Sequence, residues 1–224
     1  MRNIWFLIFG LMGFSLVAQT NTPPVAQIAP GAVENLQTLL NKPGFIKNTA
    51  AAAMGKNWFK MDTDIHMFTD EVSFAQVAAV LLDLDNQSKY FQGKKNKLNA
   101  TVVQKNPGDT IVDFVSITPA LGFQIKTPYR ASVKTPENSE TILSVEINQL
   151  ASDSASNNSI KNLFTFRYAQ AVTIGGKTYT YIRFYVYDEV NASILPGAQK
   201  ILAGSSDDAN SEALQLLVAA AKTR

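Results

Sequence analysis

The sequence contains no cysteine and only one histidine among its 224 residues. Without cysteine the chain can form neither disulfide bonds nor thiolate metal sites, and cysteine-based catalysis is excluded. The single histidine, His66, has no partner at metal-ligand spacing, and there is no GxSxG-type turn or phosphate-binding loop. We therefore expect no metal, no cofactor and no catalytic residue. A cyclase-like or hydrolytic activity that uses polar groups of a cavity is the weaker alternative.

An excess of charge of one sign is also missing, because the formal net charge is +2 and 17% of the residues are charged. The densest basic run, from Lys94 to Lys97, is typical of a solvated turn. We expect no nucleic-acid partner. Asp83 and Asp85 stand two residues apart and would diverge on a helix, so the end of a helix explains them better than a catalytic carboxylate pair.

A long hydrophobic run occurs in the first 18 residues. Arg2 precedes an almost wholly apolar stretch from Ile4 to Val17, and Ala18 is a small residue before the polar Gln19. This layout is typical of a secretory signal peptide. The run is shorter than the ~20 residues that a bilayer requires, although an uncleaved anchor stays open as the alternative. We expect an exported protein, periplasmic or secreted, with no transmembrane span in the mature chain.

Residues 19–56 are expected to form a tether followed by two short helices. Up to Pro30 the composition is mainly Thr, Pro, Ala, Gln and Asn, which offers little to bury. Apolar residues then recur at helical spacing between Val33 and Leu40, and the alanine-rich residues 46–54 predict a second helix. The main domain should therefore span residues 57–224.

The main domain opens with a predicted strand over residues 58–68, where apolar and polar side chains alternate. Ser73 and Gln76 then form a capping-box pattern. An apolar helical stripe follows at Phe74, Val77, Ala78, Leu81 and Leu82, and a short second helical turn includes Tyr90.

After Gly93 the apolar period changes to two. It predicts six strands, over residues 98–104, 110–118, 123–134, 141–149, 160–173 and 177–189. Turn-forming residues separate most of them, and Gly175 with Gly176 predicts a tight hairpin. A terminal amphipathic helix is expected over residues 207–222, with Ser205 and Asp208 in a capping-box relation and Leu217 on its apolar stripe.

This order of elements resembles the START-like superfamily, also called polyketide cyclase-like or SRPBCC, which has the helix-grip fold. Two stretches carry the resemblance: residues 77–91, a helix ending in an aspartate and followed by paired aromatics, and residues 181–197, an aromatic last strand with a Pro-containing bend. The resemblance implies an α+β fold in which a curved antiparallel sheet of about seven strands wraps around a long C-terminal helix, with two short helices after the first strand. It also implies a hydrophobic ligand, such as a lipid, sterol or polyketide, held between sheet and helix. The N-terminal extension and the polar loop 152–159 depart from the family pattern.

Several charged and aromatic residues within the strands are candidate ligand contacts. Arg183 shares one strand face with Tyr181 and Tyr185, and Arg130 and Glu146 lie in comparable apolar settings. Inside a closed cavity these charges would have to be paired, and could bind a polar head group with Leu217 of the terminal helix opposite. The alternative is that this face is the solvated convex side of the sheet, and that Ile182, Phe184 and Val186 form the inner wall.

The sequence thus predicts an exported, non-enzymatic protein that binds a lipid or another hydrophobic small molecule. The alternative is a cell-envelope interaction or scaffold module with the same fold and a filled interior. A protein partner in the envelope is expected in that second case, with the N-terminal extension as its docking segment.

Overall fold

The computed structural model of the chain describes residues 38–55, 57–120, 123–150, 160–192 and 197–224. The predicted signal peptide, the predicted tether, the polar loop 152–159 and most of the first predicted helix lie outside these ranges. Of that first helix only residues 38–40 are described. They form a turn and a bridge, in which Leu40 pairs with Phe68.

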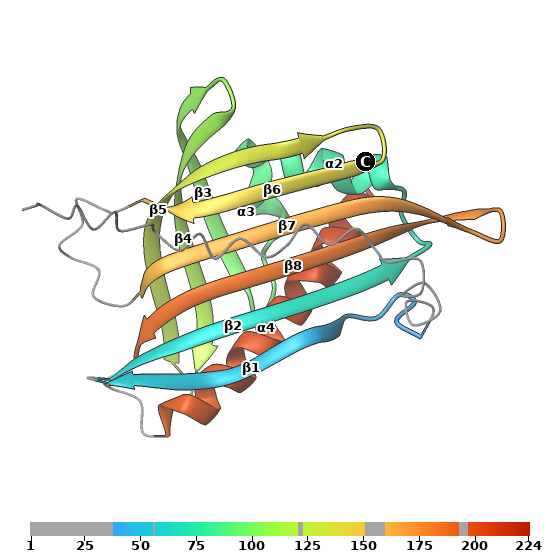
Figure 1. Ribbon diagram of the computed structural model, residues 1–224. Coiled ribbons are helices and arrows are strands. Elements are labelled where there is room, and N and C mark those ends of the chain that lie inside the picture. Colours follow the sequence, from blue (N-terminus) through green and yellow to red (C-terminus); the bar gives the residue numbers. More distant parts are fainter. Residues whose placement is uncertain (1–37, 56, 121–122, 151–159, 193–196) are drawn as a thin grey trace, which may run out of the picture.

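Eight strands in the described part form one curved antiparallel sheet, in the order β1-β2-β8-β7-β6-β5-β4-β3 (Figure 1). The strand predicted first and the six predicted after Gly93 are all confirmed. Their bounds are β2 Trp58–Thr69, β3 Lys97–Asn106, β4 Asp109–Ala120, β5 Phe123–Asn138, β6 Ile142–Gln149, β7 Ile160–Ile174 and β8 Lys177–Asn191. β5 runs past Pro136, where the sequence predicted a turn, because the register with β6 shifts between Lys134 and Glu137 and leaves the proline outside the regular ladder.

The eighth strand is β1, Gly44–Gly55, and the prediction of a helix over residues 46–54 is wrong. β1 pairs with β2 along its length, with three register shifts, at the edge of the sheet. Alanine favours helices in isolated peptides, but here tertiary packing determines that the segment forms a strand. Ala51 is fully buried against Met61, Ala192 and Leu202, where a larger side chain would hold the terminal helix away. The sheet therefore begins before the boundary predicted at residue 57.

Two helical segments follow β2 as predicted. α2, Phe74–Leu82, begins with the predicted capping box of Ser73 and Gln76. Its buried stripe includes Val80 in place of Leu82, which is 40% exposed. A single 3-10 turn, η2 Leu84–Asn86, leads into the short helix α3, Gln87–Tyr90. Asp83 is the C-cap of α2 and accepts a hydrogen bond from the hydroxyl of Tyr90 at 2.5 Å, so it does end the helix.

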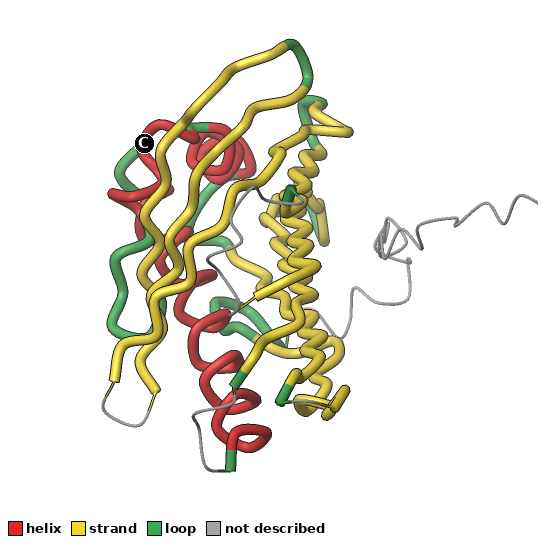
Figure 2. Tube along the Cα trace, turned by 90° about the vertical axis from the view of Figure 1, so that its left-hand side faces the viewer, coloured by secondary structure: helices red, strands yellow, loops and turns green. Residues whose placement is uncertain are grey.

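The terminal helix α4, Ala198–Ala221, is longer than predicted. It begins nine residues before Asp207, after Gly197 in the left-handed conformation, so Ser205 and Asp208 lie inside the helix and do not cap it. α4 contacts β1, β2, β4 and β8 of the sheet as well as α2. Figure 2 shows it inside the curve of the sheet. No helix in the described ranges is long and apolar enough to cross a membrane.

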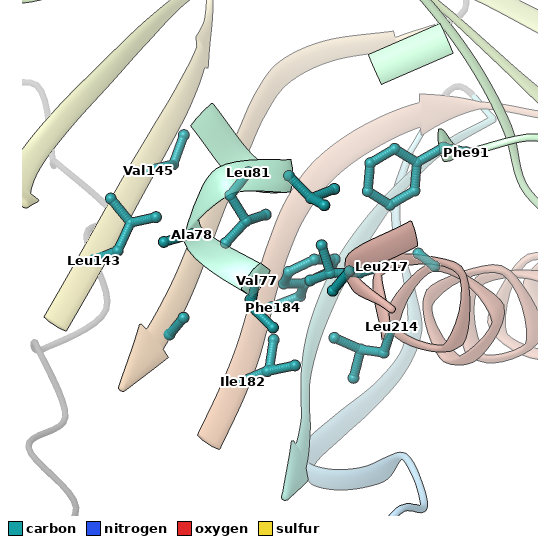
Figure 3. Packing of buried hydrophobic residues seen from close by; sticks show 14 of the residues in the cluster. Val77, Ala78, Leu81, Phe91, Leu143, Val145, Ile182, Phe184, Leu214 and Leu217 are labelled. Carbon is teal, nitrogen blue, oxygen red and sulfur yellow. The ribbon is translucent and has the colours of Figure 1, made fainter. Parts of the chain in front are cut away.

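The space between sheet and helices is filled unevenly along α4. Around its C-terminal half, large apolar side chains from α2, β6, β8 and α4 pack against one another without exposure (Figure 3). Val77 and Leu81 of α2 lie among Leu143 of β6 and Leu214 and Leu217 of α4. The N-terminal half of α4 carries smaller and more polar residues, and there the interior is hollow.

Candidate ligand cavity

A cavity of about 200 Å³ lies between the sheet and the N-terminal half of α4. It lies beside the packed core and shares Phe91, Leu98, Phe184 and Ala213 with it. Strands β4, β5, β7 and β8 line it from the concave side of the sheet. The hollow therefore lies between the elements that the helix-grip arrangement brings together.

Most of the cavity wall is apolar. Its apolar side chains include six from five elements, namely Met61 of β2, Leu98 of β3, Ile125 of β5, Phe184 and Val186 of β8, and Leu202 of α4. Small polar side chains lie between them, namely Ser116, Thr118, Thr127, Thr165, Ser205, Ser206 and Asn210. Apolar walls with a few polar groups are the usual lining of a small-molecule site.

Arg167 is the one cation among the described residues of this wall, and it is 8% exposed. Its Nη1 donates a hydrogen bond of 3.0 Å to Oε1 of Gln87, and its Nε has no hydrogen-bond partner in the described part of the chain. The guanidinium carbon lies 5.2 Å from the ring centre of Phe91 and 5.4 Å from that of Phe184. Burial lowers the pKa of Arg167 to about 10, so the group still carries its charge at neutral pH.

Asp188 carries the one carboxyl group among the wall residues that the structure describes. Its Oδ1 is buried and has no hydrogen-bond partner among the described residues, and burial raises its pKa to about 7. Phe184 pairs with Arg167, and Asp188 follows four residues later on the same face of β8, which is about 13 Å along the strand. Arg167 and Asp188 therefore lie at separate places in the wall. Between these strands and β4, Tyr129 of β5 also faces the cavity, and burial raises its pKa to about 12.

Glu212 of α4 fixes the loop that closes one side of the cavity. Its carboxylate accepts hydrogen bonds from the backbone N–H groups of Lys94, Lys95 and Asn96 at 2.9, 2.5 and 2.7 Å. Gly93 leaves room for this carboxylate, because a Cβ at that position would come within 2.2 Å of Oε2 of Glu212. Asn96, which this contact positions, is part of the cavity wall.

The structure answers which face of β8 lies inward. Phe184 and Val186 line the cavity and Ile182 is in the packed core, so the Ile-Phe-Val set faces α4. Arg183, Tyr181 and Tyr185 alternate with that set and lie on the outer, convex face. That face is not solvated there, however, since Arg183 is 7% exposed and Tyr181 4%.

The outer position of Arg183 is stabilised by an ion pair with Asp64 on the neighbouring strand. Nε and Nη2 of Arg183 donate to the two carboxylate oxygens of Asp64 at 2.8 and 2.6 Å, which is a bidentate geometry. His66 lies beside this pair and edge-on to the ring of Tyr181, with 6.0 Å between the ring centres. Burial is the largest cause that lowers the pKa of His66, and the described residues include no cluster of three or more potential metal ligands.

The other predicted contacts also lie away from the cavity. Arg130 alternates with Tyr129, lies on the outer face and forms a bidentate pair with Asp113 at 2.6 and 2.8 Å. Glu146 alternates with the buried Val145 and Ile147 and points outward from β6. Leu217 is fully buried in the packed core. A ligand contact of Arg130, Glu146, Tyr181, Arg183, Tyr185 or Leu217 stays a prediction, and none of the six lines this cavity.

Sequence reasoning missed Arg167 and Asp188. For Asp188 a signal was present, because the alternation of Ile182, Phe184 and Val186 continues to it. For Arg167 no signal in its own strand shows which way it points. Its face follows only from the pairing of Arg167 with Phe184 across β7 and β8.

The sequence matches no known protein family profile and no curated protein. Solved structures are similar in fold. One, from Thermus thermophilus, has a TM-score of 0.50 at 13% identity and covers 72% of this chain and 96% of its own. Human STARD10 has a TM-score of 0.51 at 10% identity and covers 76% of this chain and 71% of its own. A third structure is the Zhui aromatase/cyclase from Streptomyces, which has a TM-score of 0.49 at 13% identity and covers 74% of this chain and 95% of its own. No conclusion is based on this third match. At such identities the matches show the fold alone: the chain has the START-like helix-grip fold.

Proposed function

We propose that this chain is an exported, non-enzymatic carrier that holds a lipid or another hydrophobic small molecule between the sheet and α4. The observation that carries the proposal is the cavity itself. The neighbouring half of the same interface is packed solid with large side chains, whereas small residues of α4 leave this half hollow. Hydrophobic ligands are also what the START-like resemblance implies.

The size of the cavity limits the size of the ligand that it can hold. A cavity of about 150 Å³ lined by apolar residues is enough to bind benzene, and pockets for drug-sized ligands measure about 300–1,000 Å³. At about 200 Å³ the hollow suits a single chain or a small ring system. A two-chain lipid would require α4 and the sheet to separate.

Export and the lack of catalysis are parts of the proposal that rest on the sequence. The first 18 residues have the layout of a signal peptide. The two charged residues of the described cavity wall, Arg167 and Asp188, occupy backbone positions about 13 Å apart along the strands, which does not favour joint action on one bond. We propose that the chain binds its ligand without changing it.

Extraction of the purified protein tests the proposal. A chemically defined lipid or small hydrophobic molecule, recovered in a fixed ratio and identified by mass spectrometry, is the expected result. Replacing Ala209, whose side chain lines the cavity, by Phe should fill the space and abolish recovery. Replacing Ala219, on the exposed side of the same helix, by Phe is the matched control and should leave recovery unchanged. Equal recovery from all three proteins would contradict binding in this cavity.

The second candidate is an envelope interaction module with the same fold, which the solid packing around the C-terminal half of α4 favours. Its docking segment would be the N-terminal extension. Because β1 is part of the sheet, the deletion that tests this function should remove residues 19–37 only. A partner lost without any change in folding or in bound lipid would support the interaction module.

A further inference from the structure

The guanidinium of Arg167 is largely buried, and no neutralising partner lies beside it in the described part of the chain. In the described part of the chain its polar contact is Gln87, which carries no charge, and its ring contacts are Phe91 and Phe184. Its Nε has no acceptor. A buried cation is unfavourable unless it is paired and its donors are satisfied, and the two rings supply only a fraction of what an anion would.

Among the residues that the structure describes, no carboxylate is close enough to Arg167 to fill this role. Tyr129, from β5, faces it across the cavity and stays protonated at neutral pH, because burial raises its pKa to about 12. The backbone of Asp188 lies about 13 Å further along β8 than that of Phe184, the partner of Arg167, and no hydrogen bond or ion pair between described residues joins Asp188 to Arg167. The wall of the cavity therefore offers a cation, and a hydroxyl near it, to whatever occupies the space.

We propose that the ligand is a small single-chain or single-ring amphiphile with one carboxylate, which binds to Arg167 while the apolar body extends along β8 toward Asp188. This inference rests on the proposed function, since it names the chemical class of the ligand of the same cavity. A carboxylate fits the planar donor fork of arginine in a bidentate manner, and the unused Nε supplies one of its two donors.

Asp188 fixes the direction in which such a ligand binds. A ligand carboxylate at the Asp188 end of the cavity would lie beside another carboxyl group. The two groups would repel each other or share one proton. The middle of the cavity, between the two ends, is lined by Phe184 and Val186 and suits an alkyl chain or a ring. The far end suits a hydrogen-bond donor such as a hydroxyl, because Oδ1 of Asp188 has no donor in the described part of the chain.

A pair of probes that differ only in charge tests the inference. Decanoate and its methyl ester have nearly the same shape, and calorimetry or displacement of a fluorescent fatty acid can measure both below their micelle concentrations. The wild-type protein should bind decanoate about 10- to 100-fold more tightly than the ester near neutral pH, which is the range that a hydrogen bond to a charged group contributes.

Variants of Arg167 assign this preference to its side chain. R167Q removes the charge and should lower the affinity for decanoate about 10- to 100-fold while the affinity for the ester stays nearly the same. R167K keeps the charge without the planar fork, and should retain part of the preference. K126Q is the matched control, because Lys126 lies exposed on β5 between the cavity-lining Ile125 and Thr127 and points away from them.

Each other result overturns the inference in a distinct way. If the wild type binds decanoate and its methyl ester with equal affinity, the ligand needs no carboxylate and the inference is wrong. The proposal that the cavity binds a hydrophobic molecule would still stand. If R167Q binds neither probe although it unfolds as the wild type does, then Arg167 shapes the cavity wall and does not bind the anion. If neither probe binds to the wild type, both the inference and the proposed function fail for this class. If R167Q does not fold, the affinities of the wild type and of R167K for the two probes still test the inference.

Discussion

Replacing Asp188 by Asn should change how the stability of the protein depends on pH. The substitution keeps the size and shape of the side chain and removes its ionisation. In the folded protein burial raises the pKa of Asp188 from its ordinary value of 3.8 to about 7. The folded state thus disfavours the carboxylate, whereas the unfolded chain ionises it freely.

The sign and the magnitude follow from proton linkage. Between pH 3.8 and about 7 the folded state binds more protons at Asp188 than the unfolded state, so the free energy of unfolding falls as the pH rises through this window. A shift of about three pKa units, at 1.36 kcal/mol each, amounts to about 4 kcal/mol. The contribution is fully present below pH 3.8 and fully lost above about pH 7. Water that enters the cavity would solvate the carboxylate, which makes this figure an upper bound.

Urea unfolding of lipid-free wild type and D188N at a series of pH values measures the effect. The two proteins should be about equally stable near pH 4, and D188N should become the more stable one toward pH 8, by up to about 4 kcal/mol. Taking the difference cancels groups common to both, such as His66, whose pKa burial lowers. Parallel stability curves would refute the placement of Asp188 in a dry wall.

Three further substitutions test an ion pair of the outer face, the loop beside the cavity and a glycine of α4 by the same unfolding measurement. R183M leaves Asp64 as an unpaired buried carboxylate and should lower the free energy of unfolding by about 3 kcal/mol, and the double variant R183M/D64N should lose less; an equal loss in both would contradict a buried pair. E212A frees three backbone N–H groups of the loop at Lys94–Asn96 and should lose about 2 kcal/mol, so no loss would mean that the loop holds itself. G204A should gain about 1 kcal/mol, because a Cβ there meets nothing within 4 Å and alanine is the better helix former; a loss of stability would show that the glycine is needed.

Alternation along single strands predicted most of the sheet. Residues 98–104 and 177–189 are examples in which apolar and polar residues alternate between turn-forming residues, and the structure extends both strands by only a few residues. β1 could not be found in this way. It is an irregular edge strand whose alanines reflect the close approach of α4, and that approach is a property of the folded molecule.

The inward face of β8 could not be predicted from β8 alone. Alternation identifies a buried face only when the two faces differ in polarity. Here Tyr181 and Arg183 on the outer face are as buried as Ile182 and Phe184 on the inner one. The sequence reasoning selected the chemically conspicuous residues, Arg183 and its tyrosines, whereas register places Arg167 and Asp188 inside.

The composition of α4 explains both where the cavity lies and why the start of this helix was predicted too late. Near its middle, Ser205, Ser206 and Asn210 line the cavity with short polar side chains, and the exposed Gly204 precedes them. Glycine, serine and asparagine are poor helix formers. The second half of α4 contains large apolar residues such as Leu214, which fill the space beneath the sheet. Nε of Arg167 and Oδ1 of Asp188 are buried and have no hydrogen-bond partner in the described part of the chain, which reduces stability, as does a glycine in the helix interior. The two charged residues line the cavity, and the glycine lies in the part of α4 that passes it. Natural proteins keep such unfavourable local features mainly at functional sites. Their occurrence together in one half of the interface is therefore what we expect of a cavity that its ligand completes.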